Sequence, residues 1–297
     1  MSRHSLIHIR TPGYWPLPKF VSIYDGAEWQ ALSPIKLGEK EGEYEGEGPA
    51  RADRSPPDFF ILEAAITKAL PKKIHLQIGA QKRRIVLSRW IGGLYSNLRS
   101  SASQKEVRSF YDAIASRYKY HVEPGRDKQL LALATALAPL LPKNAKVLDA
   151  SAGDCTFAKA AKEAGLDFEV FCSDISPEML ELRDKTIVPA SRIAVAPASR
   201  LPYPASSFDA VVHTYSNIHP SDKKMFRSFL RVLKEGGLLL YHPVKAPGEQ
   251  WPKKFEEKVG KSMRAAGFAT VERRIAHAKG ARRQTMLTFY VAGPKGD

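Results

Sequence analysis

The chain has 297 residues, of which 43% are hydrophobic, so it can bury one or two ordinary cores and is not wholly disordered. Its longest apolar run, residues 130–141, is too short to span a bilayer, and its first residues lack the apolar stretch of a secretory signal. We therefore expect a protein of the cytoplasm with no transmembrane segment.

The formal net charge is +15, and it is concentrated at the two ends of the chain. Residues 1–105 carry 16 basic and 10 acidic side chains, residues 106–250 carry 19 and 17, and residues 251–297 carry 11 and 4. A basic surface favours an anionic partner such as RNA, an anionic membrane face or an acidic substrate, although it also serves solubility alone. The two cysteines, Cys155 and Cys172, suggest neither a disulfide framework nor a thiolate metal site.

The first part of the chain, residues 1–104, predicts a small α+β module. Short extended pieces such as LIHIR and KIHLQIG alternate with one helix candidate, PDFFILEAAITKAL at residues 57–70, whose apolar positions recur at helical spacing. Residues 38–57 alternate Glu with Gly and can bury little, so we predict a mobile loop there. The serine-rich segment at residues 97–104 predicts a hinge that ends the module.

From residue 105 onward, helical segments alternate with short apolar strands such as KVLDA, FEVFCSD, FDAVVHTY and GGLLLYHPV. This alternation requires crossover connections, so we predict a Rossmann-like α/β fold whose sheet is mostly parallel with helices on both faces. Two later extended stretches, TVERRIAHA and QTMLTFYVAG, are close enough to pair as a hairpin. We expect one domain over residues 105–297 with a seven-stranded sheet.

Polar residues follow four of the predicted strands. Ligands of a doubly wound sheet bind outside the carboxyl ends of its strands. Asp149 ends the first strand and opens the loop SAGDC. Asp174 ends the second strand about twenty residues further on, where an acidic residue can accept hydrogen bonds from two ribose hydroxyls. The other two segments are APASRLPYPASSF and HTYSNIHP.

Together these segments resemble the class I S-adenosylmethionine-dependent methyltransferases. The resemblance covers residues 105–297 and rests on VLD, on Asp before ISPEML, and on LPYPASSFDAVV, FLRVLKEGGLLL and AAGF in that order. The helix VRSFYDAIASRYKYH is similar to the tyrosine-bearing helix of the subgroup that methylates quinones and other small molecules. The resemblance implies S-adenosylmethionine as cofactor and a small-molecule substrate.

By this resemblance, Asp149, Ser151 and Gly153 surround the methionine part of the cofactor and Asp174 binds its ribose. The remaining contacts that it implies are Ile175 and Met179 at the adenine, Ala198 and Ser199 at the adenine edge, and Tyr111 and Tyr118 over the cofactor.

The loop departs from the family pattern at two positions. The family usually has glycine where Ser151 and Cys155 stand, because the backbone turns sharply there and passes close to the ligand. Outside the loop, the family often has an acidic residue at the position of Pro197. Serine and cysteine are small and the ligand carries no phosphate, so we expect the loop to bind the cofactor, but less tightly.

Candidates for catalysis lie near the ends of the fourth and fifth strands: His213, Tyr215, His219 and His242. Imidazole titrates near neutral pH, so one histidine could accept a proton from the substrate, and His219 is favoured over His213 because it lies in the loop. A base is optional, since methyl transfer needs mainly alignment. The histidines lack the paired helical spacing of a metal site, so we predict no metal.

Two other functions stay open, and the oligomeric state is not predicted. An RNA methyltransferase would use both basic ends, KKIHLQIGAQKRRIVLSRW and AKGARRQ, to follow a phosphate backbone. A non-catalytic protein that binds ligands in the same cleft is the third possibility.

Overall fold

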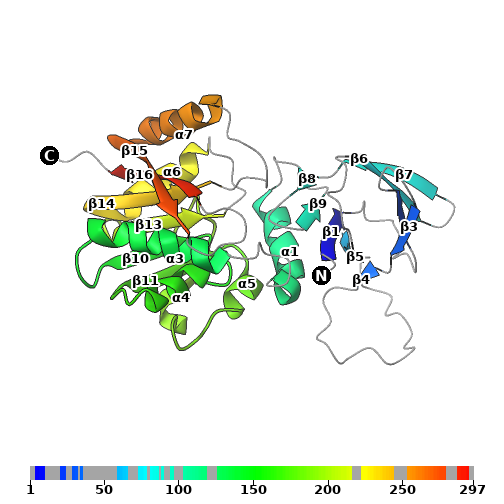
Figure 1. Ribbon diagram of the computed structural model, residues 1–297, viewed down its shortest axis with the longest axis horizontal. Coiled ribbons are helices and arrows are strands. Elements are labelled where there is room, and N and C mark those ends of the chain that lie inside the picture. The colour runs from blue at the N-terminus through cyan, green and yellow to red at the C-terminus, as the bar shows by residue number, and fades with distance from the viewer. Residues whose placement is uncertain are drawn as a thin grey trace. The chain divides into compact units, whose positions relative to one another are not determined.

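A computed structural model shows two compact units, Met1–Glu106 with Arg117–Val122, and Val107–Ser116 with Glu123–Asp297 (Figure 1). Among residues 1–102, only the side chains of His75 and Arg84 are described. The structure describes residues 4–10, 21–24, 29–32, 34–35, 59–65, 73–78, 81–86, 88–89, 94–96, 103–118, 126–215, 222–243, 253–278 and 286–293.

The described stretches between residues 4 and 96 are strands that form two sheets, in the orders β4-β5-β1-β9-β8 and β3-β2-β6-β7. Strands β6 and β7 form an antiparallel hairpin. The strands are β1 His4–Arg10, β2 Val21–Tyr24, β3 Trp29–Leu32, β4 Pro34–Ile35, β5 Phe59–Ala65, β6 Lys73–Ile78, β7 Gln81–Val86, β8 Ser88–Arg89 and β9 Leu94–Ser96.

The predicted helix at residues 57–70 is wrong where the structure describes it. Phe59–Ala65 is strand β5, which pairs antiparallel with β1 along its whole length and also with β4. A short apolar run does not distinguish a helix from a strand by its periodicity, so pairing with distant segments decides the outcome. The predicted loop at residues 38–57 lies wholly outside the described residues, and the predicted hinge at residues 97–104 lies largely outside them.

The second unit contains the predicted seven-stranded sheet, in the order β12-β11-β10-β13-β14-β16-β15. Strands β10 to β14 pair in parallel, whereas β16 pairs antiparallel with both β14 and β15, so the terminal hairpin is confirmed. The strands are β10 Lys146–Ala150, β11 Glu169–Asp174, β12 Ile193–Val195, β13 Phe208–Thr214, β14 Leu233–His242, β15 Thr270–His277 and β16 Met286–Gly293.

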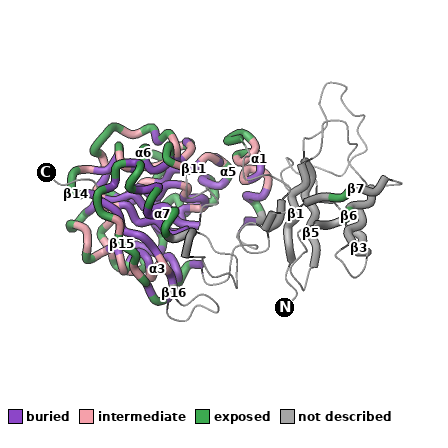
Figure 2. Tube along the Cα trace, turned by 90° about the horizontal axis from the view of Figure 1, so that it is seen from above, coloured by how far each residue is buried: buried purple, intermediate pink, exposed green. Residues whose placement is uncertain are grey.

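Helices flank this sheet, and buried residues fill the space between them (Figure 2). Helix α3 contacts α4, and α6 contacts α7. None of the described helices is long and apolar enough to cross a bilayer. The helices are α1 Gln104–Ile114, α3 Arg126–Leu137, α4 Thr156–Glu163, α5 Pro177–Glu181, α6 Lys223–Val232 and α7 Lys253–Ala266.

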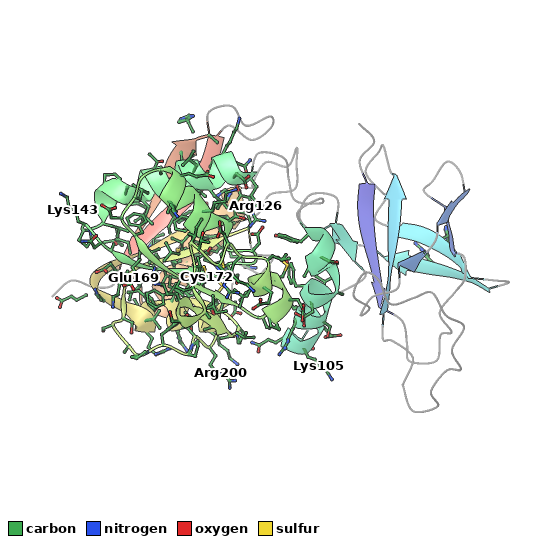
Figure 3. The ribbon with its side chains drawn as sticks, turned by 90° about the horizontal axis from the view of Figure 1, so that it is seen from below. Lys105, Arg126, Lys143, Glu169, Cys172 and Arg200 are labelled. Carbon is green, nitrogen blue, oxygen red and sulfur yellow. The ribbon has the colours of Figure 1, made fainter. Side chains whose placement is uncertain are left out.

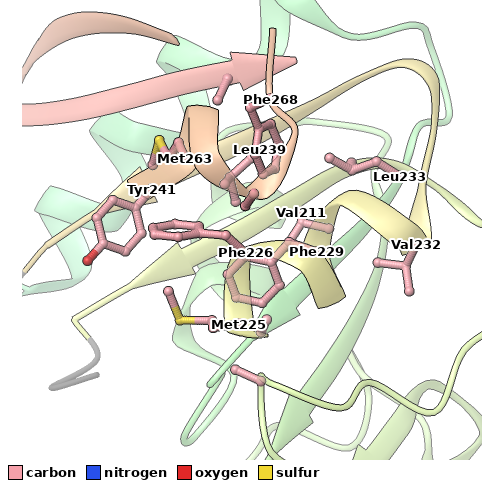
Figure 4. Close-up of a cluster of buried hydrophobic side chains, with 14 of the residues drawn as sticks. Val211, Met225, Phe226, Phe229, Val232, Leu233, Leu239, Tyr241, Met263 and Phe268 are labelled. Carbon is pink, nitrogen blue, oxygen red and sulfur yellow. The ribbon is translucent and has the colours of Figure 1, made fainter. Parts of the chain in front are cut away.

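Alternation along β10 divides its side chains between the two faces of the sheet. Leu148 and Ala150 belong to a buried cluster with Phe226 and Phe229 of α6 and Met263 of α7 (Figure 4). Burial of each such large side chain stabilises the fold by about 1.5–3 kcal/mol. Because successive strand residues point to opposite faces, Asp149 lies on the other face of the sheet.

Strand β10 lies at the point where the order of the sheet reverses, with β11 on one side and β13 on the other. Open α/β sheets bind their ligands at the carboxyl ends of the strands beside this point. Figure 3 shows Arg126 at this edge, whereas Lys143 and Glu169 lie toward the opposite end of the domain.

Candidate active site

The loop after β10 has left-handed backbone at three positions: φ is 64° at Ser151, 57° at Gly153 and 58° at Cys155. This conformation costs a non-glycine residue about 1–2 kcal/mol. A Cβ atom on Gly153 would lie only 3.2 Å from Cε of Met179. The loop therefore keeps a backbone conformation suited to glycine even at Ser151 and Cys155. The two substitutions relative to the family pattern lower stability but leave the backbone conformation unchanged.

We expect Ser151→Gly to increase the free energy of unfolding by about 0.5–1 kcal/mol. Glycine removes the left-handed strain, and this gain exceeds the extra entropy that glycine loses on folding. Urea denaturation measures the change. Ser151→Ala is the control, since it keeps Cβ and should give no gain. A glycine variant less stable than the alanine variant would contradict the strain argument.

Asp174 holds the loop and the start of α5 together. Its Oδ2 accepts a hydrogen bond from the Gly153 amide at 2.9 Å, and its Oδ1 accepts one from the Ser176 amide at 2.9 Å. Burial raises the pKa of the Asp174 carboxyl to about 6, although these amide hydrogen bonds oppose the shift. Each carboxylate oxygen keeps a second lone pair, so the oriented group can still accept hydrogen bonds from two hydroxyls.

Helix α1 reaches the same region through Asp112, which sequence reasoning missed. The Ser176 hydroxyl donates to Asp112 Oδ1 at 2.6 Å and accepts from the Met179 amide at 3.1 Å, so it also caps α5. Tyr111 is half-buried and its ring meets Phe110 edge-on at 5.0 Å. Tyr118 is buried, but it groups with the first compact unit, and its contact with the cofactor stays a prediction.

Asp149 lies near the charge of Arg126, a residue that no sequence motif singles out. Arg126, the first residue of α3, is 6% exposed and pairs with Asp154 of the loop, with Nη2 and Oδ1 2.8 Å apart. The Thr156 hydroxyl donates to the same Asp154 oxygen at 2.7 Å. Burial raises the pKa of Asp149 to about 8. The Arg126 charge opposes this shift, whereas the carboxylates of Asp174 and Asp154 add to it.

A second cluster lies where β13 and β14 end. Tyr215 has a φ of 56°, which is strained for a bulky residue, and its hydroxyl donates to Gln129 Oε1 of α3. Its ring meets His242 edge-on at 5.1 Å, and the Arg126 guanidinium lies 5.9 Å from the ring centroid. His242 is buried, and its Nδ1 bonds the Thr288 carbonyl at 2.7 Å. Helix α3 thus connects this cluster to the cofactor loop.

His213 lies in the core rather than in this cluster. It is 1% exposed, stacks on Tyr241 at 5.7 Å and packs against Phe229 of α6. Its Nδ1 bonds the Ala150 carbonyl at 2.8 Å, and burial lowers its pKa to about 4. The alternation of β13 explains this position, because His213 shares a face with the core residue Val211.

The other predicted residues surround the same edge of the sheet with different exposures. Met179 and Ala198 are buried, whereas Ile175 and Ser199 are half-buried. His219 lies outside the described residues, so its role stays a prediction. Within the described stretches, no cluster of His, Cys, Asp and Glu could hold a metal ion.

Comparison with known proteins matches part of the second unit to methyltransferases. Residues 148–241 match the family model described as a methyltransferase domain. The ubiquinone/menaquinone biosynthesis C-methyltransferase UbiE of Pasteurella multocida is 38% identical over 105 residues, 33% of this chain and 39% of that protein. The Bordetella parapertussis enzyme of the same name is 34% identical over 148 residues, 46% of this chain and 55% of that protein. The chain contains a class I S-adenosylmethionine-dependent methyltransferase domain.

S-adenosylmethionine is the cofactor of this methyltransferase domain, as predicted. The crystal structure of the [4+2]-cyclase SpnF matches at a TM-score of 0.51 with 18% identity, over 70% of this chain and all of that one. That likeness concerns the fold alone, and the name of that protein shows that the methyltransferase fold does not fix the reaction. The chain spans 39% and 55% of the length of the two curated relatives named above.

Proposed function

We propose that this protein transfers a methyl group from S-adenosylmethionine to a ring carbon of a quinol-like small molecule. The observation that carries the proposal is the similarity of its methyltransferase domain to C-methyltransferases of quinone biosynthesis, at 38% identity over 105 residues. The fold alone would leave the reaction open.

The residues at the carboxyl edge of the sheet suit the cofactor. Asp174 presents an oriented carboxylate for the ribose hydroxyls, and the Gly153 backbone leaves room close to the loop. Asp149 offers a buried carboxyl for the amino group of the methionine part, and Arg126 offers a charge of opposite sign for its carboxylate. Bound S-adenosylmethionine supplies an electrophilic methyl group.

His242 is the best described candidate for the base. A ring carbon beside an ionised hydroxyl is nucleophilic, so carbon methylation requires that the hydroxyl lose its proton and that the methylated carbon later lose its own. The hydrogen bond to the Thr288 carbonyl requires the proton on Nδ1 of His242, which makes Nε2 the basic nitrogen. His213 is poorly suited, because its pKa of about 4 is too low for a base at neutral pH.

The test supplies radiolabelled S-adenosylmethionine with hydroxylated benzoquinols and naphthoquinols, and with bulk tRNA as the competing acceptor. We expect label in a quinol, and NMR of the product should place the new methyl group on carbon. Each of three results would overturn the proposal: label in tRNA, a methyl group on oxygen, or no label in any quinol although the cofactor binds.

We expect His242→Gln to lower the rate of methyl transfer by roughly 10² to 10⁴ while the affinity for the cofactor stays unchanged. At saturating cofactor, the pH profile of the wild-type rate should show an ionisation between about 5.5 and 8 that the variant loses. His219→Gln is the matched comparison. If His219→Gln alone causes the loss, His219 is the base; if neither variant does, alignment alone drives transfer.

A further inference from the structure

A row of aromatic and basic residues crosses the sheet β3-β2-β6-β7. Trp29 lies opposite Tyr24, Tyr24 lies opposite His75, and His75 lies opposite Arg84. Residues directly opposite each other on neighbouring strands share a face, with Cβ atoms about 4.5–5.5 Å apart. The four residues therefore form one row across all four strands, on a single face.

The same face carries further cations and no acidic residue at its paired positions. The next row places Lys82 opposite Gln77, and Lys73 lies opposite Val86. Ala31 and Val86 are the only aliphatic residues at the paired positions of this face. The described side chains agree with a solvated face, because His75 and Arg84 are both exposed.

The opposite face of these strands is mainly aliphatic, with Ile23, Leu76 and Ile78 at its centre. A sheet that is aliphatic on one side and polar on the other packs the aliphatic side inward. The face that carries the exposed residues His75 and Arg84 is therefore the one we assign to a partner. Strands β3, β6 and β7 lie together in one part of the first unit (Figure 1).

The surrounding sequence has an unusual charge pattern. Residues 64–105 contain nine Lys or Arg residues and no Asp or Glu. A solubilising surface usually mixes both signs of charge, whereas a continuous basic segment attracts a polyanion. Charge complementarity therefore points to an anionic macromolecule.

We propose that this face binds single-stranded RNA, with bases stacked on Trp29, Tyr24 and His75 and phosphates bound by Arg84 and Lys82. Four-stranded sheets with aromatic residues on one face are suited to stacking unpaired bases, because every base has a π-face. An anionic membrane fits less well, since membrane binding needs buried apolar area as well as charge, and the only aliphatic residues at the paired positions of this face are Ala31 and Val86. The proposal does not depend on which molecule the methyltransferase domain modifies.

The test measures fluorescence anisotropy of a labelled 12-nucleotide oligouridine with the full chain at low salt. We expect binding that weakens steeply as salt is added, because neutralised phosphates release counterions. Tyr24→Ala should weaken binding by about tenfold or more, as expected for the loss of one stacked base. Tyr24→Phe should restore most of the affinity, because it keeps the ring.

Arg84→Ala and Arg83→Ala form a matched pair, since adjacent strand residues lie on opposite faces of the sheet and each change removes one positive charge. We expect Arg84→Ala to weaken binding about fivefold or more and Arg83→Ala by less than twofold. Thermal melts by circular dichroism confirm that both variants are folded.

Three outcomes would overturn the proposal. Equal losses in the Arg83 and Arg84 variants would mean diffuse attraction without a binding face. Binding to phosphatidylglycerol vesicles without binding to oligouridine would make the face a membrane surface. No binding of oligouridine at low salt would remove the RNA partner altogether.

Discussion

Asp174→Ala is expected to weaken S-adenosylmethionine binding by about 100-fold to 10,000-fold. The variant loses two charge-assisted hydrogen bonds to the ribose, each worth about 1.5–3 kcal/mol. It also leaves the Gly153 and Ser176 amides without their acceptor, so the loop itself should loosen. Isothermal titration calorimetry measures the loss of affinity.

The control for this prediction is Asp174→Asn, which keeps one carbonyl oxygen and the shape of the side chain. We expect its affinity to fall between those of the wild type and the alanine variant. Unchanged affinity in the alanine variant would show that the ribose binds elsewhere.

The pH of this experiment matters because burial raises the pKa of Asp174 to about 6 in the folded protein, against about 3.9 in an unfolded chain. The folded state therefore favours the protonated carboxyl. The stability that protonation contributes is fully present below about pH 4 and is lost as the pH rises through about 6. Measurements at pH 7.5 keep the carboxylate ionised and ready to accept hydrogen bonds.

The sequence was sufficient to predict the sheet of the methyltransferase domain, because its strands are separated by helix-length segments and each is strongly apolar. The positions of Asp149 and Asp174 were also predictable, since each lies at the carboxyl end of a strand and their separation fits a known spacing. Neither inference required knowledge of contacts between segments distant in the chain.

Other features depend on contacts that no local pattern encodes. Strand β5 was predicted as a helix because its apolar run fits both periods, and only its pairing with β1 decides between them. Arg126, Gln129 and Asp112 come from helices before the first strand of the sheet, and their partners Asp154, Tyr215 and Ser176 lie at least 28 residues away in sequence. Polar side chains on helices look like ordinary surface residues until the fold buries them, as it buries Arg126 and Gln129.

Asp149→Asn is expected to change stability and cofactor binding in opposite directions. Burial raises the pKa of Asp149 to about 8 in the folded protein, so the fold favours the protonated group. The stability contributed by the proton is present below about pH 4 and is lost as the pH rises through about 8. At pH 8.5 the wild type must bury a carboxylate, whereas asparagine is neutral, so the variant should melt about 3–10 °C higher. At pH 4 the difference should nearly vanish.

Cofactor binding should move the other way, because the amino group of S-adenosylmethionine favours an ionised Asp149. Below pH 8 the wild type should therefore release a proton from Asp149 on binding, and its affinity should rise between pH 6 and 7.5. Calorimetry in two buffers of different ionisation enthalpy counts this proton. The asparagine variant should bind at least about tenfold more weakly and lack the release from this site. Equal proton release in both proteins would show that Asp149 does not contact the amino group. A variant less stable than the wild type at pH 8.5 would show that the fold stabilises the buried carboxylate.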